Sequence, residues 1–211
     1  MKENNLQAMY IAKIGEAVAR LDSVDYFLAD YETRSNIPHL EAAMLQTRKA
    51  LECIAFAAIA PDKKQYEKFR KESEKNSDFT KDYNASKIFH ALSLINPDFY
   101  PKPLLPAQRQ TDGSWHFDNK KSGTLAKERF KRIYDQLGKH LHAHNPWGLD
   151  KSMQNLAKEL PTVIKETRAL IQLHARFIRT SDFNGVWIID ASTSAPCVLT
   201  GAAKGPYIIQ D

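Results

Sequence analysis

The sequence predicts a mainly α protein, an up-and-down helical bundle of four or five helices with a long crossover loop and a small C-terminal β element. Three observations support this fold class. Apolar residues recur at intervals of three and four over most of the first 180 residues, which is the period of a helix with one buried face. The 211 residues include only 8 glycines, too few for the many turns of a barrel or sandwich. Short β-branched runs gather in the last 31 residues, after residue 180.

The first two predicted helices carry the clearest apolar stripes. In the first, the stripe consists of Leu6, Tyr10, Ile14, Ala17, Leu21, Val24, Leu28 and Tyr31. The second helix begins near Pro38, because proline is favoured in a first turn, and it ends at Pro61. Residues 53–60 are apolar all round, which predicts a central place in the bundle for this end of the helix.

The middle of the chain predicts one shorter helix and a long crossover. Residues 62–78 are mainly Lys, Glu and Ser, typical of a solvated helix or a connection. A helix follows over about residues 79–95 and ends at Asn96, because the residue before proline avoids the α region. Residues 96–123 hold four prolines among several large apolar residues. We expect this crossover loop to pack against the bundle, either as a functional loop or only as a connection.

The last third of the chain predicts two more helices and a β tail. One helix follows Thr124, and a long one runs over about residues 149–180, in a single register through Pro161. The tail contains two or three short strands split by glycine and proline. We therefore expect a helical bundle over residues 1–180 and a short β extension over residues 181–211 that packs on it.

The composition indicates the cellular compartment and the classes of partner that we expect. Cys53 and Cys197 lie far apart and neither belongs to a CxxC pair, which argues against a disulfide scaffold or a thiolate zinc site. No run of 18 apolar residues is present, and the first residues do not resemble a signal peptide. We expect a cytoplasmic protein with no membrane partner. The net charge of +5 is compatible with a polyanionic partner.

The most informative window for function is residues 120–148. Seven Lys or Arg residues stand against two acids between Lys120 and Lys139, an excess of five positive charges. The residues that follow are His140, His142, His144 and Asn145. Arginine and lysine bind phosphate oxygens, and histidine transfers protons near neutral pH. Together they suit RNA cleavage without a metal, by attack of the ribose 2′-hydroxyl on phosphate. The alternative is a solvated basic helix face with histidines at its end.

The spacing of the three histidines also allows a metal site. In an extended segment, side chains two residues apart point the same way, so the imidazoles of His140, His142 and His144 could converge on zinc. On a helix they would point in different directions. No HExxH pattern is present, and we expect neither a metal nor another cofactor.

Several other polar residues have structural interpretations. His174 lies on an apolar stripe and His90 beside Phe89, so both are predicted to be packed in the core. Arg48 and Glu52 are four residues apart, which predicts a helical ion pair or, alternatively, a polar centre inside the bundle.

Three stretches of the chain resemble the HEPN superfamily of helical bundles, abundant in bacterial toxin and antiphage systems. They are QTRKALECIAFAAIA, LINPDFYPKP and YDQLGKHLHAHNPWG, and the first two resemble a little-characterised bacterial subgroup. Active members of the superfamily are metal-independent ribonucleases, in which four to six residues separate an Arg from a His and the pair faces a two-fold partner's copy. Here seven residues separate Arg132 from His140.

The resemblance implies a homodimer and a set of site residues. His142 or His140 would be the general acid and base, with Asn145 as a polar helper, while Arg132 and Lys139 would hold the phosphate. The remaining residues expected to bind substrate are Arg129, Lys131, Tyr134 and His144. Three hypotheses follow: an RNA-directed endoribonuclease of a toxin or defence system, a non-catalytic module that binds nucleic acid or a partner protein such as an antitoxin, and a histidine-ligated metal hydrolase.

Overall fold

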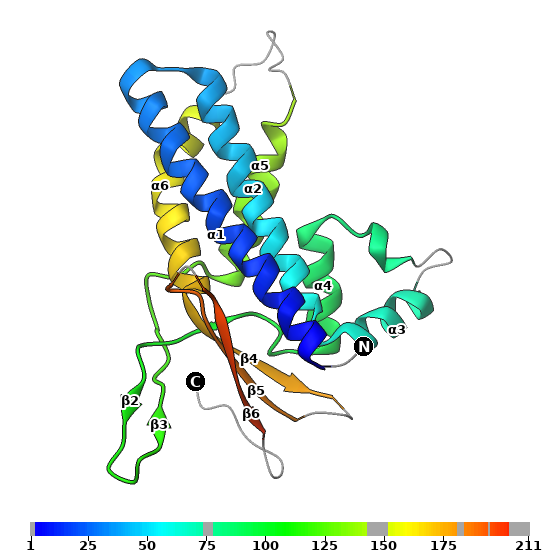
Figure 1. Cartoon of the computed structure of the whole chain (residues 1–211). Coiled ribbons are helices and arrows are strands. Elements are labelled where there is room, and N and C mark those ends of the chain that lie inside the picture. Colours follow the sequence, from blue (N-terminus) through cyan, green and yellow to red (C-terminus); the bar gives the residue numbers. More distant parts are fainter. Residues whose placement is uncertain (1–2, 74–77, 143–151, 181–183, 194, 203–211) are drawn as a thin grey trace.

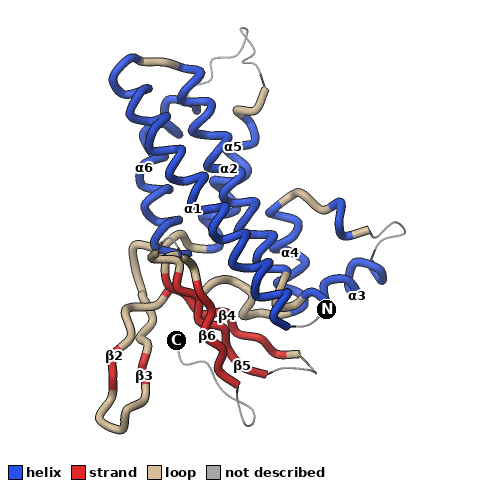
Figure 2. The backbone as a smooth tube through the Cα atoms, viewed as in Figure 1, coloured by secondary structure: helices blue, strands red, loops and turns tan. Residues whose placement is uncertain are grey.

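The computed structural model describes residues 3–73, 78–142, 152–180, 184–193 and 195–202, and this part of the chain is mainly helical with a small C-terminal antiparallel sheet (Figures 1 and 2). Its helices are α1 (Glu3–Arg34), α2 (Ile37–Ile59), α3 (Lys63–Ser73), a 3-10 turn η1 (Phe79–Lys81), α4 (Ala85–Ile95), α5 (Lys127–Lys139) and α6 (Ser152–Ile171). Its strands are β1 (Lys102–Pro103), β2 (Gln108–Arg109), β3 (Trp115–His116), β4 (Leu173–Arg179), β5 (Asn184–Asp190) and β6 (Cys197–Ala202). The expected mainly helical fold class is confirmed, with six α-helices in the described residues instead of four or five.

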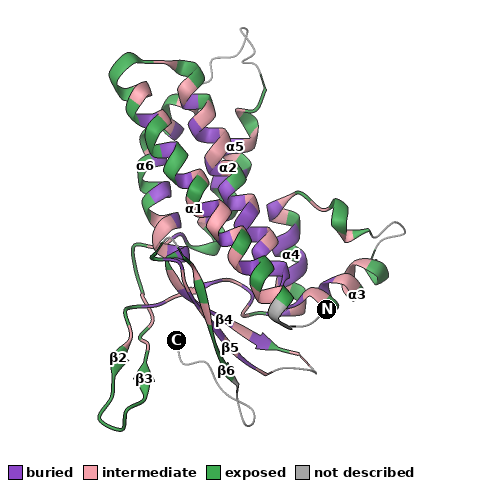
Figure 3. Ribbon diagram, viewed as in Figure 1, coloured by how far each residue is buried: buried purple, intermediate pink, exposed green. Residues whose placement is uncertain are grey.

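Helix α2 lies at the centre of the helical part. It packs against α1 along its length and also against α4, α5 and α6. The predicted stripe of α1 is buried, with Tyr10, Ile14 and Leu21 at most 1% exposed, and most of the apolar end of α2 is buried as well (Figure 3). The chain reverses between the two helices at Ser35, which has a positive φ of 53°, and Pro38 lies in the first turn of α2 as expected.

A four-stranded antiparallel sheet lies against the ends of α1 and α2. Its order is β1-β4-β5-β6, so that the two-residue strand β1, from the crossover loop, pairs with β4. Residues on alternate positions of β4 and β5 face the helices and are buried, among them His174, Arg176, Trp187 and Ile189. The hairpin β2–β3 forms a separate two-stranded arm that projects beyond the sheet (Figure 1).

The last helix is shorter than its apolar pattern predicts. We expected helix up to Thr180, but α6 ends at Ile171 and strand β4 begins at Leu173. The sheet therefore starts inside the range 1–180 that we assigned to the bundle. Apolar residues at 170, 171, 177 and 178, with His174 on the same stripe, fit a helical repeat, whereas seven consecutive pairings with β5 fix this segment as a strand. Helix α6 does pass through Pro161 as one helix, as predicted.

The connections between the long helices agree with the predictions in part. Residues 63–73 form a solvated helix, α3, in which Tyr66 is buried. The helix expected over 79–95 is divided into η1 and α4. The crossover loop packs against the helices as expected, because Phe99 is fully buried and the Tyr100 hydroxyl donates to the Leu125 carbonyl.

Candidate nucleic-acid interface

Two of the predicted site residues on α5 serve to hold α5 against α6. The guanidinium of Arg129 forms ion pairs with Glu159 at 3.0 Å and with Glu166 at 2.7 Å. Arg132 forms an ion pair with the same Glu159 at 2.7 Å, although half of its side chain is exposed. The expectation that Arg129 binds substrate is therefore not supported, because both of its terminal guanidinium nitrogens contact carboxylates.

Tyr134 is likewise part of the protein's interior. It is 1% exposed, its hydroxyl donates to Glu52 Oε1 at 3.0 Å, and it accepts from Arg48 Nη2 at 2.7 Å. Burial raises the pKa of Tyr134 to about 12, so its hydroxyl stays protonated. The expectation that Tyr134 binds substrate is wrong for this reason.

Arg48 connects α2 to α5 through this tyrosine. Its guanidinium carbon lies 3.8 Å from the centre of the Tyr134 ring, and Nη1 donates to the Tyr134 carbonyl at 2.8 Å. Glu52 Oε1 lies 3.3 Å from Arg48 Nε. Both alternatives for this pair are observed, because Arg48 and Glu52 form the i,i+4 ion pair and together with Tyr134 also form a part-buried polar centre between α2 and α5. A Cβ on Gly138 would lie 2.8 Å from Arg48 Nη1, which explains a glycine within the helix.

The histidine segment begins where α5 ends. His140 is the half-buried C-cap residue, and its backbone N–H donates to the Leu137 carbonyl at 3.3 Å. Lys139 and His142 are exposed to solvent. His144 and Asn145 lie outside the described residues. In the part of the chain that is described, no three His, Cys, Asp or Glu side chains are close enough to hold a metal ion.

A basic groove lies between α3, the segment 79–84, α4 and Lys131 of α5. We call it the α3–α5 groove. It has a volume of about 550 Å³ and adjoins a second hollow of about 220 Å³, which shares Ser86, His90 and Lys131 with it. Of the predicted substrate-binding residues that the structure describes, Lys131 is the one that lines this groove.

Positive charge dominates the α3–α5 groove. The two adjoining hollows are lined by five cations, Arg70, Lys81, Lys87, Lys127 and Lys131, against the two carboxylates of Asp82 and Glu128. Asp82 is neutralised locally, because Arg70 donates to both of its oxygens, at 2.9 and 3.0 Å. Within the described residues, no ion pair or hydrogen bond occupies the ammonium groups of Lys87 and Lys131. These cations are therefore available to an anionic ligand.

An aromatic side chain and a helix terminus complete the groove. Tyr83 is 74% exposed and lines the groove. Asn84 caps α4 by accepting from the Lys87 backbone N–H at 3.0 Å, and Asn84, Ser86 and Lys87 all line the groove. His90, predicted to be packed in the core, is exposed and lines the groove. The sequence pattern did not indicate this site, because its cations lie on four elements, α3, η1, α4 and α5, that only folding brings together.

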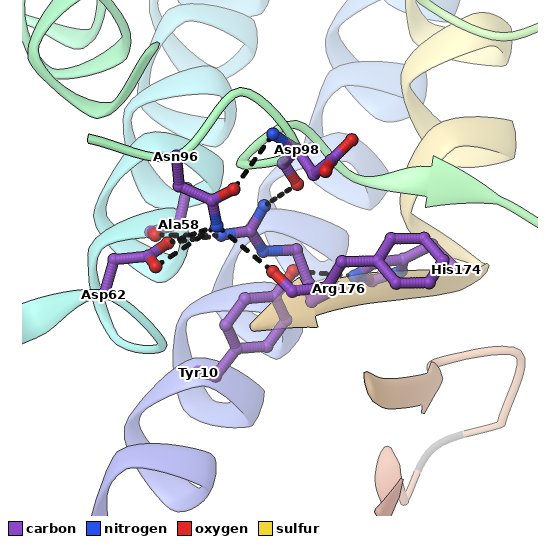
Figure 4. Close-up of polar contacts among 8 residues, drawn as sticks. Tyr10, Ala58, Asp62, Asn96, Asp98, His174 and Arg176 are labelled. Atoms are coloured by element: carbon purple, nitrogen blue, oxygen red, sulfur yellow. Dashed lines mark hydrogen bonds and ion pairs between the residues drawn. The ribbon is translucent and has the colours of Figure 1, made fainter. Parts of the chain in front are cut away.

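A second polar cluster is closed to solvent and joins the helices to the sheet (Figure 4). Arg176 on β4 is fully buried, and its Nη2 donates to Asp62 Oδ2 at 3.2 Å and to the Ala58 carbonyl at 3.3 Å. Its Nη1 donates to the Asp98 carbonyl at 3.1 Å. The Asn96 amide donates to both oxygens of Asp62. We assign this cluster a structural role, because no bulk water reaches it.

His174 belongs to the same buried region and is the packed core histidine that we predicted. Its Nε2 accepts from the Tyr10 hydroxyl at 2.8 Å, and its Nδ1 donates to the Ile171 carbonyl at 3.0 Å. Burial lowers the pKa of His174 to about 3, so the ring is neutral, and burial raises the pKa of Tyr10. Both ring nitrogens have partners, which leaves neither for catalysis.

Comparison with protein-family models, curated proteins and solved structures found no match for this chain. Among the described helices, none combines the length and the apolar character needed to cross a lipid bilayer.

Proposed function

We propose that this protein binds single-stranded RNA through the α3–α5 groove. The observation that carries the proposal is a groove of about 550 Å³ in which lysines that form no ion pair within the described residues lie beside an exposed tyrosine. This corresponds to the non-catalytic hypothesis, a helical module that binds nucleic acid.

The lysines account for the affinity. Lys87 and Lys131 project from α4 and α5 into one hollow, and Lys127 lines the adjoining one. Phosphate groups along a nucleic-acid backbone would neutralise these cations and release condensed counterions. Lys127 also lies 5.8 Å from the centre of the Phe99 ring, which holds its stem near the groove.

Tyr83 accounts for the preference for a single strand. An exposed aromatic ring beside a basic groove is the arrangement on which unpaired bases stack, and such stacking contributes roughly 1–3 kcal/mol per base. Bases inside a duplex are already stacked on each other and cannot use this ring. We therefore expect weaker binding to a duplex of the same length.

The experiment is fluorescence anisotropy with a labelled oligouridine. The double variant Lys87→Gln/Lys131→Gln should bind at least tenfold more weakly and lower the slope of log K against log salt by about 1.4, since each phosphate contact to a single strand contributes about 0.7. The matched control is Lys158→Gln/Lys165→Gln, which removes the same charge from exposed positions of α6. Equal weakening by both double variants would show that only the net charge matters. A deoxyuridine oligomer and a duplex are the competing ligands.

A second candidate is the metal-independent endoribonuclease of a toxin or antiphage defence system, supported by the exposure of Lys139 and His142 around the half-buried His140. In this proposal the HEPN-like bundle forms a homodimer, His142 or His140 transfers the proton, and an antitoxin is a possible protein partner. The test is incubation with total RNA in the presence of EDTA. Cleavage that resists EDTA and is lost in His142→Ala supports this activity. Binding without cleavage leaves the module hypothesis, and cleavage abolished by EDTA supports the metal hydrolase.

A further inference from the structure

A second large hollow lies on the face of the sheet away from the helices, between the sheet and the β2–β3 arm. We call it the arm–sheet pocket. Its volume is about 550 Å³, which is within the usual range of small-molecule sites. One wall is the outward face of the sheet, the other is the arm, and the end of α6 closes it at Ala169 and Gln172. The pocket shares no lining residue with the α3–α5 groove.

Both walls of the arm–sheet pocket are mainly apolar. On the sheet wall, Ile188 and Leu199 alternate with the residues that face the helices, and Leu199 is 58% exposed. The outward face of an antiparallel sheet that contacts only water normally carries polar residues. On the arm, Leu105 is 41% exposed and Trp115 62% exposed. Such exposed apolar surface around a hollow is typical of a site that a ligand covers.

One cation, Lys120, and one anion, Asp190, line this mainly apolar pocket, and they differ in whether a polar partner already occupies them. Asp190 Oδ1 already accepts from the backbone N–H and the hydroxyl of Ser192. Lys120 is half-buried, and no ion pair or side-chain hydrogen bond engages its ammonium within the described residues. A partly buried ammonium without a partner is costly, so an anionic group on the ligand would offset that cost.

We propose that the arm–sheet pocket binds a small aliphatic carboxylate, with the alkyl chain between Trp115 and Leu199 and the carboxylate at Lys120. The alkyl chain would exclude water from the two apolar walls, while the carboxylate would accept hydrogen bonds from the Lys120 ammonium. This binding is independent of RNA binding in the α3–α5 groove.

The test uses isothermal titration calorimetry with decanoate, decanol and decylammonium, each below its micelle concentration. We expect decanoate to bind the wild-type chain with one site and at least tenfold more tightly than decanol, and decylammonium to bind most weakly. Lys120→Gln should remove the advantage of decanoate over decanol. The matched control Lys121→Gln, at the exposed neighbouring position, should retain it. Leu199→Glu should weaken decanoate and decanol.

Four outcomes of the calorimetry would overturn the proposal. They are the absence of saturable decanoate binding, equal affinities for decanoate and decanol, an unchanged decanoate affinity in Lys120→Gln, and equal losses in the two lysine variants. Light scattering on the same samples tests the main competing occupant, a second copy of the chain. A wild-type dimer that Leu199→Glu converts to a monomer would show that a second copy covers the pocket, and would overturn the assignment to a carboxylate.

Discussion

Replacing Arg176 with methionine tests whether the buried polar cluster holds the sheet to the helices. Methionine keeps most of the apolar stem but removes every donor. In the wild type the guanidinium donates to Asp62 Oδ2 at 3.2 Å and to the carbonyls of Ala58 and Asp98 at 3.3 and 3.1 Å. In the variant, the Asp62 carboxylate stays buried with the Asn96 amide as its remaining donor within this cluster.

The expected loss is large because one partner of a buried ion pair disappears. Breaking such a pair costs about 3–5 kcal/mol, and we expect Arg176→Met to lower the free energy of unfolding by about 4 kcal/mol at neutral pH. Burial already raises the pKa of Asp62, and loss of the guanidinium raises it further. A native state with a raised carboxyl pKa takes up its proton at higher pH than the unfolded chain. The deficit of the variant relative to wild type should therefore shrink as the pH falls from 7 to 5.

The assay is urea unfolding followed by far-ultraviolet circular dichroism, at both pH values. Arg179→Met is the matched control, because this arginine is 44% exposed and its ion pair with Asp98 at 3.3 Å is on the surface. We expect the control to lose less than about 1 kcal/mol. The double variant Asp62→Asn/Arg176→Met should recover at least about 1 kcal/mol relative to Arg176→Met, since no buried charge remains. Equal, small losses in Arg176→Met and Arg179→Met would refute this reasoning.

Three further predictions concern the buried contacts around α5 and β4. Gly138→Ala should destabilise the protein by about 1–2 kcal/mol in thermal unfolding, because its Cβ would displace Arg48 from the Tyr134 carbonyl; a gain in stability, as at an exposed helical glycine, would contradict the observed contact. Tyr10→Phe should cost about 2 kcal/mol in urea unfolding, because His174 Nε2 loses its donor inside the protein, and a loss below about 0.5 kcal/mol would argue against that hydrogen bond. The pKa of His174 is about 3 in the folded protein, against an ordinary value of 6.5, so the free energy of unfolding should be highest above pH 6.5 and should fall by about 2 kcal/mol by pH 5. His174→Gln should abolish this pH dependence, and an unchanged dependence would assign it to other groups.

The helical part of the fold could be predicted because its signals are local. The period of the α1 stripe and the prolines at 38 and 61 mark where two long helices begin and end, and the structure agrees closely. The segment 173–179 could not be assigned in this way. Its apolar positions fit a helix and a strand alike, and pairing with β5, a non-local interaction, decides between them.

The candidate site was predictable only in small part. The basic residues 120–139 indicated α5 as part of a site. They could not show that Arg129 and Arg132 form ion pairs with Glu159, which lies 27 residues or more further along the chain. Lys87 gave no signal, since a single lysine on a short helix is ordinary. Only folding places it in one groove with Lys131.

Zero-length ultraviolet crosslinking tests the RNA-binding groove most directly. The wild-type chain is irradiated with bound oligouridine, digested, and analysed by mass spectrometry for peptides that carry a nucleotide. We predict crosslinks at Tyr83 and within residues 85–91. In Tyr83→Leu, the crosslink at position 83 should disappear and RNA should bind more weakly. Crosslinks confined to the exposed faces of α1 and α6, with none in the α3–α5 groove, would contradict the proposed function.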